Sequence, residues 1–162
     1  AYQVISAEEN EDVLHWLYDL RKTTTMHLKA TCAPHYYRIM RQRAHEEGVA
    51  VTPETFGMDA LTRGGLGGTG YLFISHTAQV QPCGYLELNC GNLRETPFPE
   101  IWRNSKYFRQ FRDQKCYEGK CGVCEFHKVC GGCRARAWSM NGNHMAEEPL
   151  CTYQPKRATG AK

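Results

Sequence analysis

Cysteine residues gather in the second half of this 162-residue chain at spacings that suit metal binding. The block reads Cys121-x2-Cys124-x5-Cys130-x2-Cys133, and Cys151 follows after a further seventeen residues. A Cys-x2-Cys pair lets a tight turn direct two thiolates at one metal, with backbone N–H groups directed at the sulfurs. Gly122 and the Gly131-Gly132 pair supply the left-handed or close-approach backbone that such turns need. The spacing indicates a metal site, and it fits a four-cysteine zinc site as well as an iron–sulfur cluster.

The composition narrows the class of protein. The chain has nine cysteines, an odd number, and no secretion leader is visible, which disfavours a disulfide framework. The net charge is +3 and the basic residues are scattered, whereas nucleic-acid binding calls for a basic stripe. No apolar stretch approaches the roughly 20 residues that span a bilayer. We therefore predict a cytoplasmic protein with neither a nucleic-acid nor a membrane partner.

The elements before the cysteines suggest part of an α/β fold. Ser6 and Glu9 form a capping box before a helix predicted to end near Lys22. A short strand is predicted over 26–31, and Pro34 suits the start of a second helix that runs to Gly48. Helix, strand, helix is a fragment of an α/β pattern, and one strand cannot make a sheet. We expect its neighbouring strands to lie outside this chain.

The character of the chain changes after Gly48. The glycines of 64–70 predict a long loop. After them we predict two strands joined by a turn, then short helices, at 71–75, 80–81, 99–103, 106–113 and 134–140. The tail from Lys156 is polar and is predicted to be disordered. The fold class expected is α+β.

A set of sequence words around the cysteines resembles the SPASM/twitch auxiliary-cluster domain of radical S-adenosylmethionine (SAM) enzymes. These words are Pro82-Cys83-Gly84-Tyr85-Leu86, Gly91-Asn92-Leu93, Glu100-Ile101-Trp102, and the cysteine block with Arg134-Ala135-Arg136. The segment 31–38 is similar to the haem-biosynthesis branch of that family, in the last part of its catalytic barrel. The resemblance implies that residues 1–55 are the C-terminal remnant of a partial (β/α) barrel. Residues 56–155 would then be the iron–sulfur domain, and 156–162 the tail.

The resemblance also implies a ligand set. Cys121, Cys124, Cys130 and Cys151 match the four ligands of one auxiliary 4Fe–4S cluster. Cys83 and Cys133 match positions that serve a second cluster in two-cluster relatives. The chain lacks the two further cysteines expected before Cys83, and Cys90 or Cys116 are the substitutes available. Without a second cluster, Cys83 and Cys133 are spare or buried thiols.

The function implied is that of a longer parent enzyme. The Cys-x3-Cys-x2-Cys loop that binds the catalytic 4Fe–4S cluster is absent, so this chain alone is not expected to cleave SAM. In the haem branch the parent oxidatively decarboxylates two propionates of Fe-coproporphyrin III to vinyls, giving haem b. The partners implied are the porphyrin substrate, an electron donor or acceptor protein and the rest of the barrel. The alternatives are haem d1 maturation, peptide modification by the same scaffold, and a zinc-binding interaction module without a redox role.

Four further residues are candidates for substrate binding. Arg38 could pair with a propionate and His35 could face the porphyrin, because both follow a predicted barrel strand. The other interpretation is a helix N-terminus with a solvated arginine and packed tyrosines. Arg134 and Arg136 could balance the charge of the cluster or of the substrate, or could lie on a solvated helix face.

Overall fold

The computed structural model describes residues 4–156, which form two compact units. Of the described residues, the first unit comprises 4–65, 123–133 and 148–156, and the second comprises 66–122 and 134–147. The chain therefore passes between the units within the cysteine block. The predicted domain boundary near residue 55 stays a prediction, and the predicted disordered tail lies, beyond Lys156, outside the described residues.

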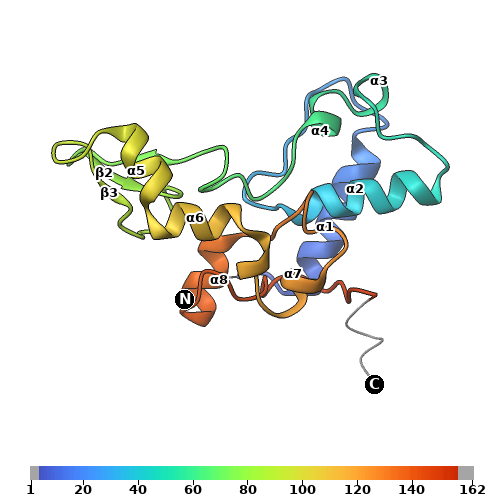
Figure 1. Ribbon diagram of the computed structural model, residues 1–162. Helices are drawn as coiled ribbons and strands as arrows, with labels where there is room; N and C mark the ends of the chain where they lie inside the picture. Colours follow the sequence, from blue (N-terminus) through green and yellow to red (C-terminus); the bar gives the residue numbers. More distant parts are fainter. Residues whose placement is uncertain (1–3, 157–162) are drawn as a thin grey trace. The chain divides into compact units, whose positions relative to one another are not determined.

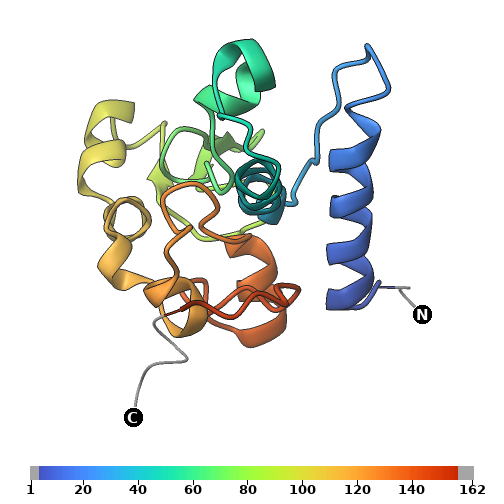
Figure 2. The ribbon, with the colours of Figure 1, turned by 90° about the vertical axis from the view of Figure 1, so that its right-hand side faces the viewer.

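The first unit is built on two packed helices, α1 (Ala7–Leu20) and α2 (His35–Glu46). Figure 2 shows α2 nearly end-on beside α1. The capping box forms as predicted, because Ser6 Oγ accepts from Glu9 N and Glu9 Oε2 accepts from Ser6 N. The short helices α3 (Pro53–Phe56) and α4 (Met58–Leu61) follow. The buried core of this unit is formed by Leu14, Tyr18, Tyr36, Ile39, Met40, Ala44 and Phe56.

The strand predicted over 26–31 is wrong, since this segment is irregular in the structure. A strand needs a partner for its backbone groups, and the described chain offers none to this segment. Of the expected helix, strand and helix, the described chain has the two helices, and the remnant of a barrel stays a prediction.

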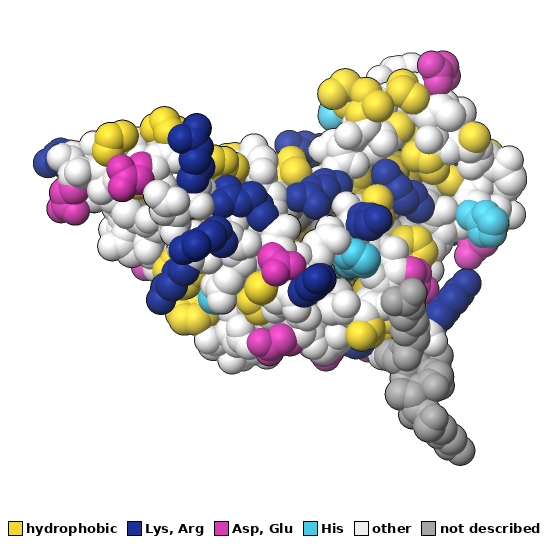
Figure 3. Space-filling view, in the orientation of Figure 1, with side chains coloured by type: hydrophobic (Ala, Val, Ile, Leu, Met, Phe, Trp, Pro, Cys, Tyr) yellow, Lys and Arg dark blue, Asp and Glu magenta, His cyan; other side chains and the backbone are white. Residues whose placement is uncertain are grey.

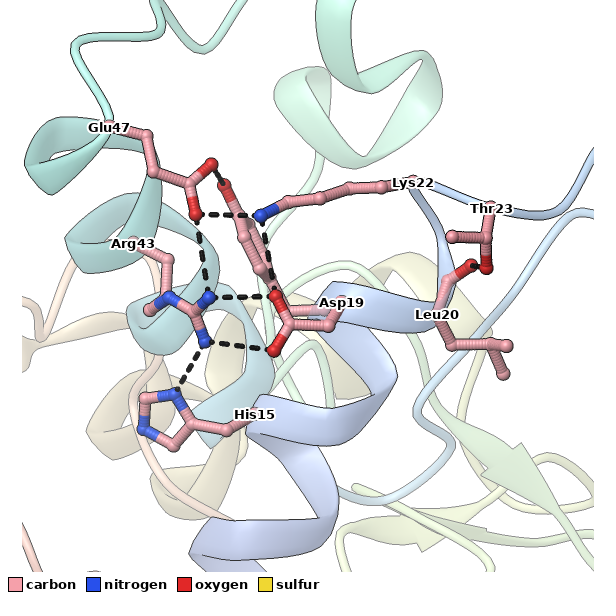
Figure 4. Close-up of polar contacts among 8 residues, drawn as sticks. His15, Asp19, Leu20, Lys22, Thr23, Arg43 and Glu47 are labelled. Carbon is pink, nitrogen blue, oxygen red and sulfur yellow. Dashed lines mark hydrogen bonds and ion pairs between the residues drawn. The ribbon is translucent and has the colours of Figure 1, made fainter.

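Polar contacts join α1 to α2 along one side (Figure 4). Arg43 Nη2 lies 2.7 Å from Asp19 Oδ1 and 3.4 Å from Glu47 Oε1, and Lys22 Nζ lies 2.7 Å from the same Glu47 oxygen. Tyr18 donates its hydroxyl to Glu47 Oε2 at 3.1 Å. These contacts fix how α2 lies against α1.

The second unit begins with a small antiparallel sheet of order β1-β2-β3, coloured yellow-green in Figure 1. Its strands are β1 (Phe73–Ile74), β2 (Gln79–Gln81) and β3 (Gly91–Asn92). Phe73 pairs with Gln81, and Gln79 pairs with Asn92. The predicted hairpin is confirmed: β1 is shorter than the predicted 71–75, β2 begins one residue before the predicted 80–81, and β3 was not predicted. Ala78 adopts φ +67° in the hairpin turn.

Four helical segments of the second unit follow the sheet. They are α5 (Phe98–Asn104), α6 (Lys106–Arg112), the 3-10 turn η1 (Gln114–Cys116) and α8 (Arg134–Asn141). A further short helix, α7 (Gly119–Val123), carries Cys121. The helices predicted near 99–113 and at 134–140 are therefore confirmed. Gly142, with φ +67°, directly follows the end of α8.

Two apolar clusters hold the second unit together. One contains Val80, Cys90, Ile101 and Phe108, and the other contains Leu86, Leu88, Phe111 and Met145.

Figure 3 shows basic side chains over the region of α5 and α6. There Arg109 and Arg112 donate to the carbonyls of Asn104 and Trp102, at 2.9 and 2.8 Å. These arginines satisfy carbonyls at the end of α5 and so connect the two helices. None of the helices described in residues 4–156 has the length and apolar character needed to cross a membrane.

Candidate metal centre

The cysteines of the predicted ligand set fall in both units. Cys124, Cys130 and Cys151 belong to the first unit and Cys121 to the second, and all four are half-buried. Within residues 4–156 no group of three or more His, Cys, Asp or Glu side chains is gathered closely enough to hold a metal ion. The four-cysteine assignment therefore rests on spacing and on family, and the structure describes the surroundings of each thiol.

The loop from Cys124 to Cys130 is closed by its own hydrogen bonds. Cys130 N donates to Phe126 O at 2.9 Å, and His127 N donates to Cys124 O at 3.1 Å. After Cys130 the chain turns through Gly131 (φ +71°) and Gly132 (φ +64°). The left-handed backbone predicted for this glycine pair is thus confirmed. A side chain at either position would oppose that conformation.

A second pair of glycines lies against this turn within the first unit. Gly64 N donates to Val129 O at 2.9 Å. A Cβ added at Gly65 would lie 2.9 Å from Cys130 O and 3.3 Å from Gly132 O. The close approach of two backbones therefore requires glycine here, which is a reason for the Gly64-Gly65 step that spacing alone did not indicate.

The segment of Cys151 packs beside the Cys124 loop. Tyr153 donates its hydroxyl to Glu125 Oε1, and its ring meets the Phe126 ring edge-on at 5.4 Å between centroids. Burial, then the hydrogen bond to Glu125, raise the pKa of Tyr153 to about 12. A residue two positions after Cys151 thus contacts the two residues that follow Cys124. This brings the sequence-distant partner to the same part of the first unit.

Glu148 is a buried carboxylate that ties together the segments of Cys133 and Cys151. It is 1 % exposed, and its Oε2 accepts from Cys133 N at 2.5 Å. Its Oε1 accepts from Leu150 N at 3.2 Å, one residue before Cys151. His35 Nε2 lies 3.8 Å from Glu148 Oε2. The sequence analysis did not identify Glu148, because an acidic residue outside any motif carries no spacing signal.

In the second unit, Glu147 accepts a hydrogen bond from a cysteine-bearing turn, as Glu148 does in the first unit. Its Oε2 accepts from Lys120 N at 2.7 Å, directly before Cys121. Gly119 has φ +55°, and a Cβ there would lie 2.5 Å from the same oxygen. A Cβ at Gly122 would lie 2.2 Å from Tyr117 O, which confirms the close approach predicted at that glycine. Consecutive carboxylates therefore each accept an N–H from a cysteine-bearing turn.

Arg134 contacts the thiol of Cys121 within the second unit. Its Nη2 donates to Cys121 Sγ at 3.5 Å, and the side chain is 5 % exposed. Its Nε is buried without a hydrogen-bond acceptor in the described chain. A buried donor beside a cysteine sulfur fits a group with further sulfur acceptors, as an iron–sulfur cluster has. Arg134 and Cys121 therefore fit the surroundings of such a cluster. Arg136, two positions later, is half-buried.

His35 and Arg38 are engaged within the first unit. His35 is fully buried, and Arg38 is 3 % exposed. Arg38 Nη2 donates to both carboxylate oxygens of Glu11, at 2.7 and 2.6 Å, and Nη1 donates to Gln42. The carboxylate that Arg38 binds is thus supplied by α1. This geometry favours packing at the start of α2 over substrate contact, although the arginine is not solvated as the packing interpretation expected.

The cysteines considered for a second cluster lie in different surroundings. Cys90 is buried in the cluster with Ile101, and burial raises the pKa of its thiol. Cys83 and Cys116 pack against the other apolar cluster of the second unit, and burial raises the pKa of Cys116 also. Cys133 belongs to the first unit. For Cys90 the surroundings favour a buried thiol.

The comparisons with known proteins agree with the sequence words. Residues 66–134 match the SPASM model, described as an iron–sulfur cluster-binding domain. The match includes the cysteine block and ends before Cys151. Residues 66–134 therefore belong to the SPASM family of iron–sulfur cluster-binding domains.

Over most of its length the chain is similar to proteins of haem biosynthesis. The chain is 77 % identical over 157 residues to the AdoMet-dependent heme synthase of Nitratidesulfovibrio vulgaris, covering 97 % of this chain and 43 % of that protein. It is 52 % identical over 151 residues to the AdoMet-dependent heme synthase of Methanosarcina barkeri, covering 93 % and 43 %. A Pre-heme d1 synthase from Dinoroseobacter shibae is 34 % identical over 101 residues, covering 60 % and 25 %. The chain thus spans less than half the length of the heme synthases it matches.

Proposed function

We propose that this chain is the auxiliary-cluster part of a radical SAM enzyme that makes haem b from Fe-coproporphyrin III. Support comes from the level of identity to AdoMet-dependent heme synthases, which exceeds that to a Pre-heme d1 synthase, 77 % against 34 %. The activity, the SAM and the catalytic 4Fe–4S cluster belong to the longer parent. The porphyrin, an electron-transfer protein and the rest of the barrel are its proposed partners.

The residues proposed to hold one 4Fe–4S cluster are Cys121, Cys124, Cys130 and Cys151. Their spacing and the SPASM match carry this proposal. The contacts of Tyr153 with the Cys124 loop support the inclusion of Cys151. When bound, such a cluster supplies a one-electron acceptor whose potential depends on burial and on hydrogen bonds to sulfur.

The chain's own contribution is to hold the ligand turns. The loss of one hydrogen atom and carbon dioxide from a propionate leaves a vinyl group and one electron, so the reaction requires an acceptor. The left-handed Gly131-Gly132 turn, Glu147 and Glu148 fix the backbone around the cysteines. A fixed ligand set lowers the structural change that accompanies electron uptake.

The ligand assignment is tested by iron binding. The chain, reconstituted anaerobically, is expected to be brown and to hold about four iron and four sulfide. Cys124→Ala should lose most of this iron. Cys32→Ala is the matched control, because Cys32 is exposed and outside the SPASM match, and it should retain the iron. Unchanged iron in Cys124→Ala, measured together with sulfide, would show the assignment to be wrong.

The zinc-module alternative is excluded by the same measurement if iron and sulfide, and not zinc, are bound. Haem d1 maturation and peptide modification stay as alternatives for the parent. Product analysis by mass spectrometry with the longer enzyme separates them, since haem b formation from Fe-coproporphyrin III is expected. A product in which no propionate has been converted to a vinyl group would contradict the proposed reaction.

A further inference from the structure

Arg134 is a buried cation whose guanidinium is held in one orientation. Its Nη1 donates to the carbonyls of Ala146 and His144, at 2.6 and 3.3 Å. The guanidinium carbon lies 4.9 Å from the centroid of the Tyr117 ring. All these contacts are within the second unit. Arg134 therefore has a fixed position within the second unit.

The rest of the guanidinium is directed at sulfur. Nη2 donates to Cys121 Sγ at 3.5 Å, and Nε is a buried donor without an acceptor in residues 4–156. Burying a charged group costs free energy unless it is paired. A thiolate ligand of a negatively charged cluster would provide that pairing. A porphyrin propionate would require an exposed arginine, and Arg134 is 5 % exposed.

We propose that Arg134 is a positioning residue that hydrogen-bonds to the Cys121 ligand thiolate and raises the reduction potential of the auxiliary cluster. This inference rests on the proposed function. Reduction adds one negative charge, so a nearby cation stabilises the reduced form more than the oxidised form. A hydrogen bond to a ligand sulfur acts in the same direction. Arg134 thus favours electron uptake.

The test is a redox titration of the reconstituted 162-residue chain, followed by electron paramagnetic resonance with dithionite as reductant. Arg134→Gln removes the charge, and Arg134→Lys retains it. Arg136→Gln is the matched control, since it removes the same charge two residues away on a half-buried side chain. The chain lacks the Cys-x3-Cys-x2-Cys loop, so no catalytic cluster contributes to the signal.

We expect Arg134→Gln to be harder to reduce, with the reduction equilibrium constant lowered at least tenfold, about 59 mV for one electron. The reduction potential of Arg134→Lys should shift less than that of Arg134→Gln. The potential of Arg136→Gln should shift by no more than about a third of the Arg134→Gln change. Equal potentials for Arg134→Gln and the parent chain, at equal iron content, would overturn the role of Arg134. A parent chain without iron would instead contradict the proposed function.

A second measurement serves if Arg134→Gln fails to fold. In the parent chain labelled with ¹⁵N-arginine, the reduced cluster should show hyperfine coupling to arginine nitrogen. The coupling should persist in Arg136→Gln and disappear in Arg134→Lys. A reduced parent cluster without ¹⁵N coupling would overturn the proposal without any variant.

Discussion

At the scale of single residues, the side chains that surround the cysteines have distinct tasks. Glu148 and Glu147 accept backbone N–H groups from the cysteine-bearing turns, and Arg134 donates to a cysteine sulfur. Removing a buried carboxylate that accepts two N–H groups lowers the stability of the fold, because both donors are left unsatisfied. These residues are therefore expected to affect the folding of the turns as well as the cluster.

Glu148→Ala is expected to destabilise the iron-free chain by about 2–3 kcal/mol, because the N–H groups of Cys133 and Leu150 lose their acceptor. Anaerobic urea unfolding measures this free energy. The exposed Glu46→Gln is the control and should change stability by less than about 0.5 kcal/mol. A Glu148→Ala chain as stable as that control would contradict the structural role of Glu148.

At the scale of elements, the polar side of the α1–α2 pair is the feature with a pH dependence (Figure 4). The hydrogen bond from Arg43 lowers the pKa of Asp19 from its ordinary 3.8, and the hydrogen bond from Lys22 lowers that of Glu47 from 4.5. Both carboxylates are exposed to solvent and screened, so the contribution of each pair is small. The network therefore joins α1 to α2 and is expected to make a small contribution to stability that depends on pH.

The stability that these carboxylates contribute is present above about pH 4.5 and is lost as the pH falls through their lowered pKa values. In the iron-free chain, the urea midpoint should therefore fall between about pH 6 and about pH 3. The double variant Asp19→Asn, Glu47→Gln should show a shallower fall over that range. High salt should also flatten the parent curve, because it screens exposed pairs. Parallel curves for the variant and the parent would show that the network does not act in this way.

At the scale of the whole molecule, the chain passes from one compact unit to the other within the cysteine block and again before Glu148. A cluster that binds the folded chain and not the unfolded chain stabilises the fold by mass action. Iron and sulfide are thus expected to act as structural components of this domain.

The reconstituted chain should melt at least roughly 5 °C above the iron-free chain, a shift that corresponds to about 2 kcal/mol for a protein of this size. Anaerobic scanning calorimetry before and after chelation measures the difference. In Cys124→Ala the two preparations should melt together, because the cluster is not held. A parent chain whose melting temperature is indifferent to iron would contradict a structural part for the cluster.

The sequence by itself determined the local features of this protein. These features are set by neighbours within a few residues. They are the capping at Ser6, the hairpin before Cys83, the helices around Phe108 and after Cys133, and the Gly131-Gly132 turn. Such signals are readable because propensity, capping and glycine conformation act over short distances. The cysteine spacing and the words around it also sufficed to identify the SPASM family.

Only the tertiary structure decided which partners meet across the sequence. The expected strand over 26–31 fails because a strand depends on a neighbour, which no local pattern supplies. Arg38 donates to Glu11 on another helix, a contact that no local pattern in the sequence indicates. The pairing of Glu148 with Cys133 and of Arg134 with Cys121 likewise joins residues 15 and 13 positions apart. Contacts of this kind depend on how the chain folds back on itself, and a periodicity or a motif does not encode them.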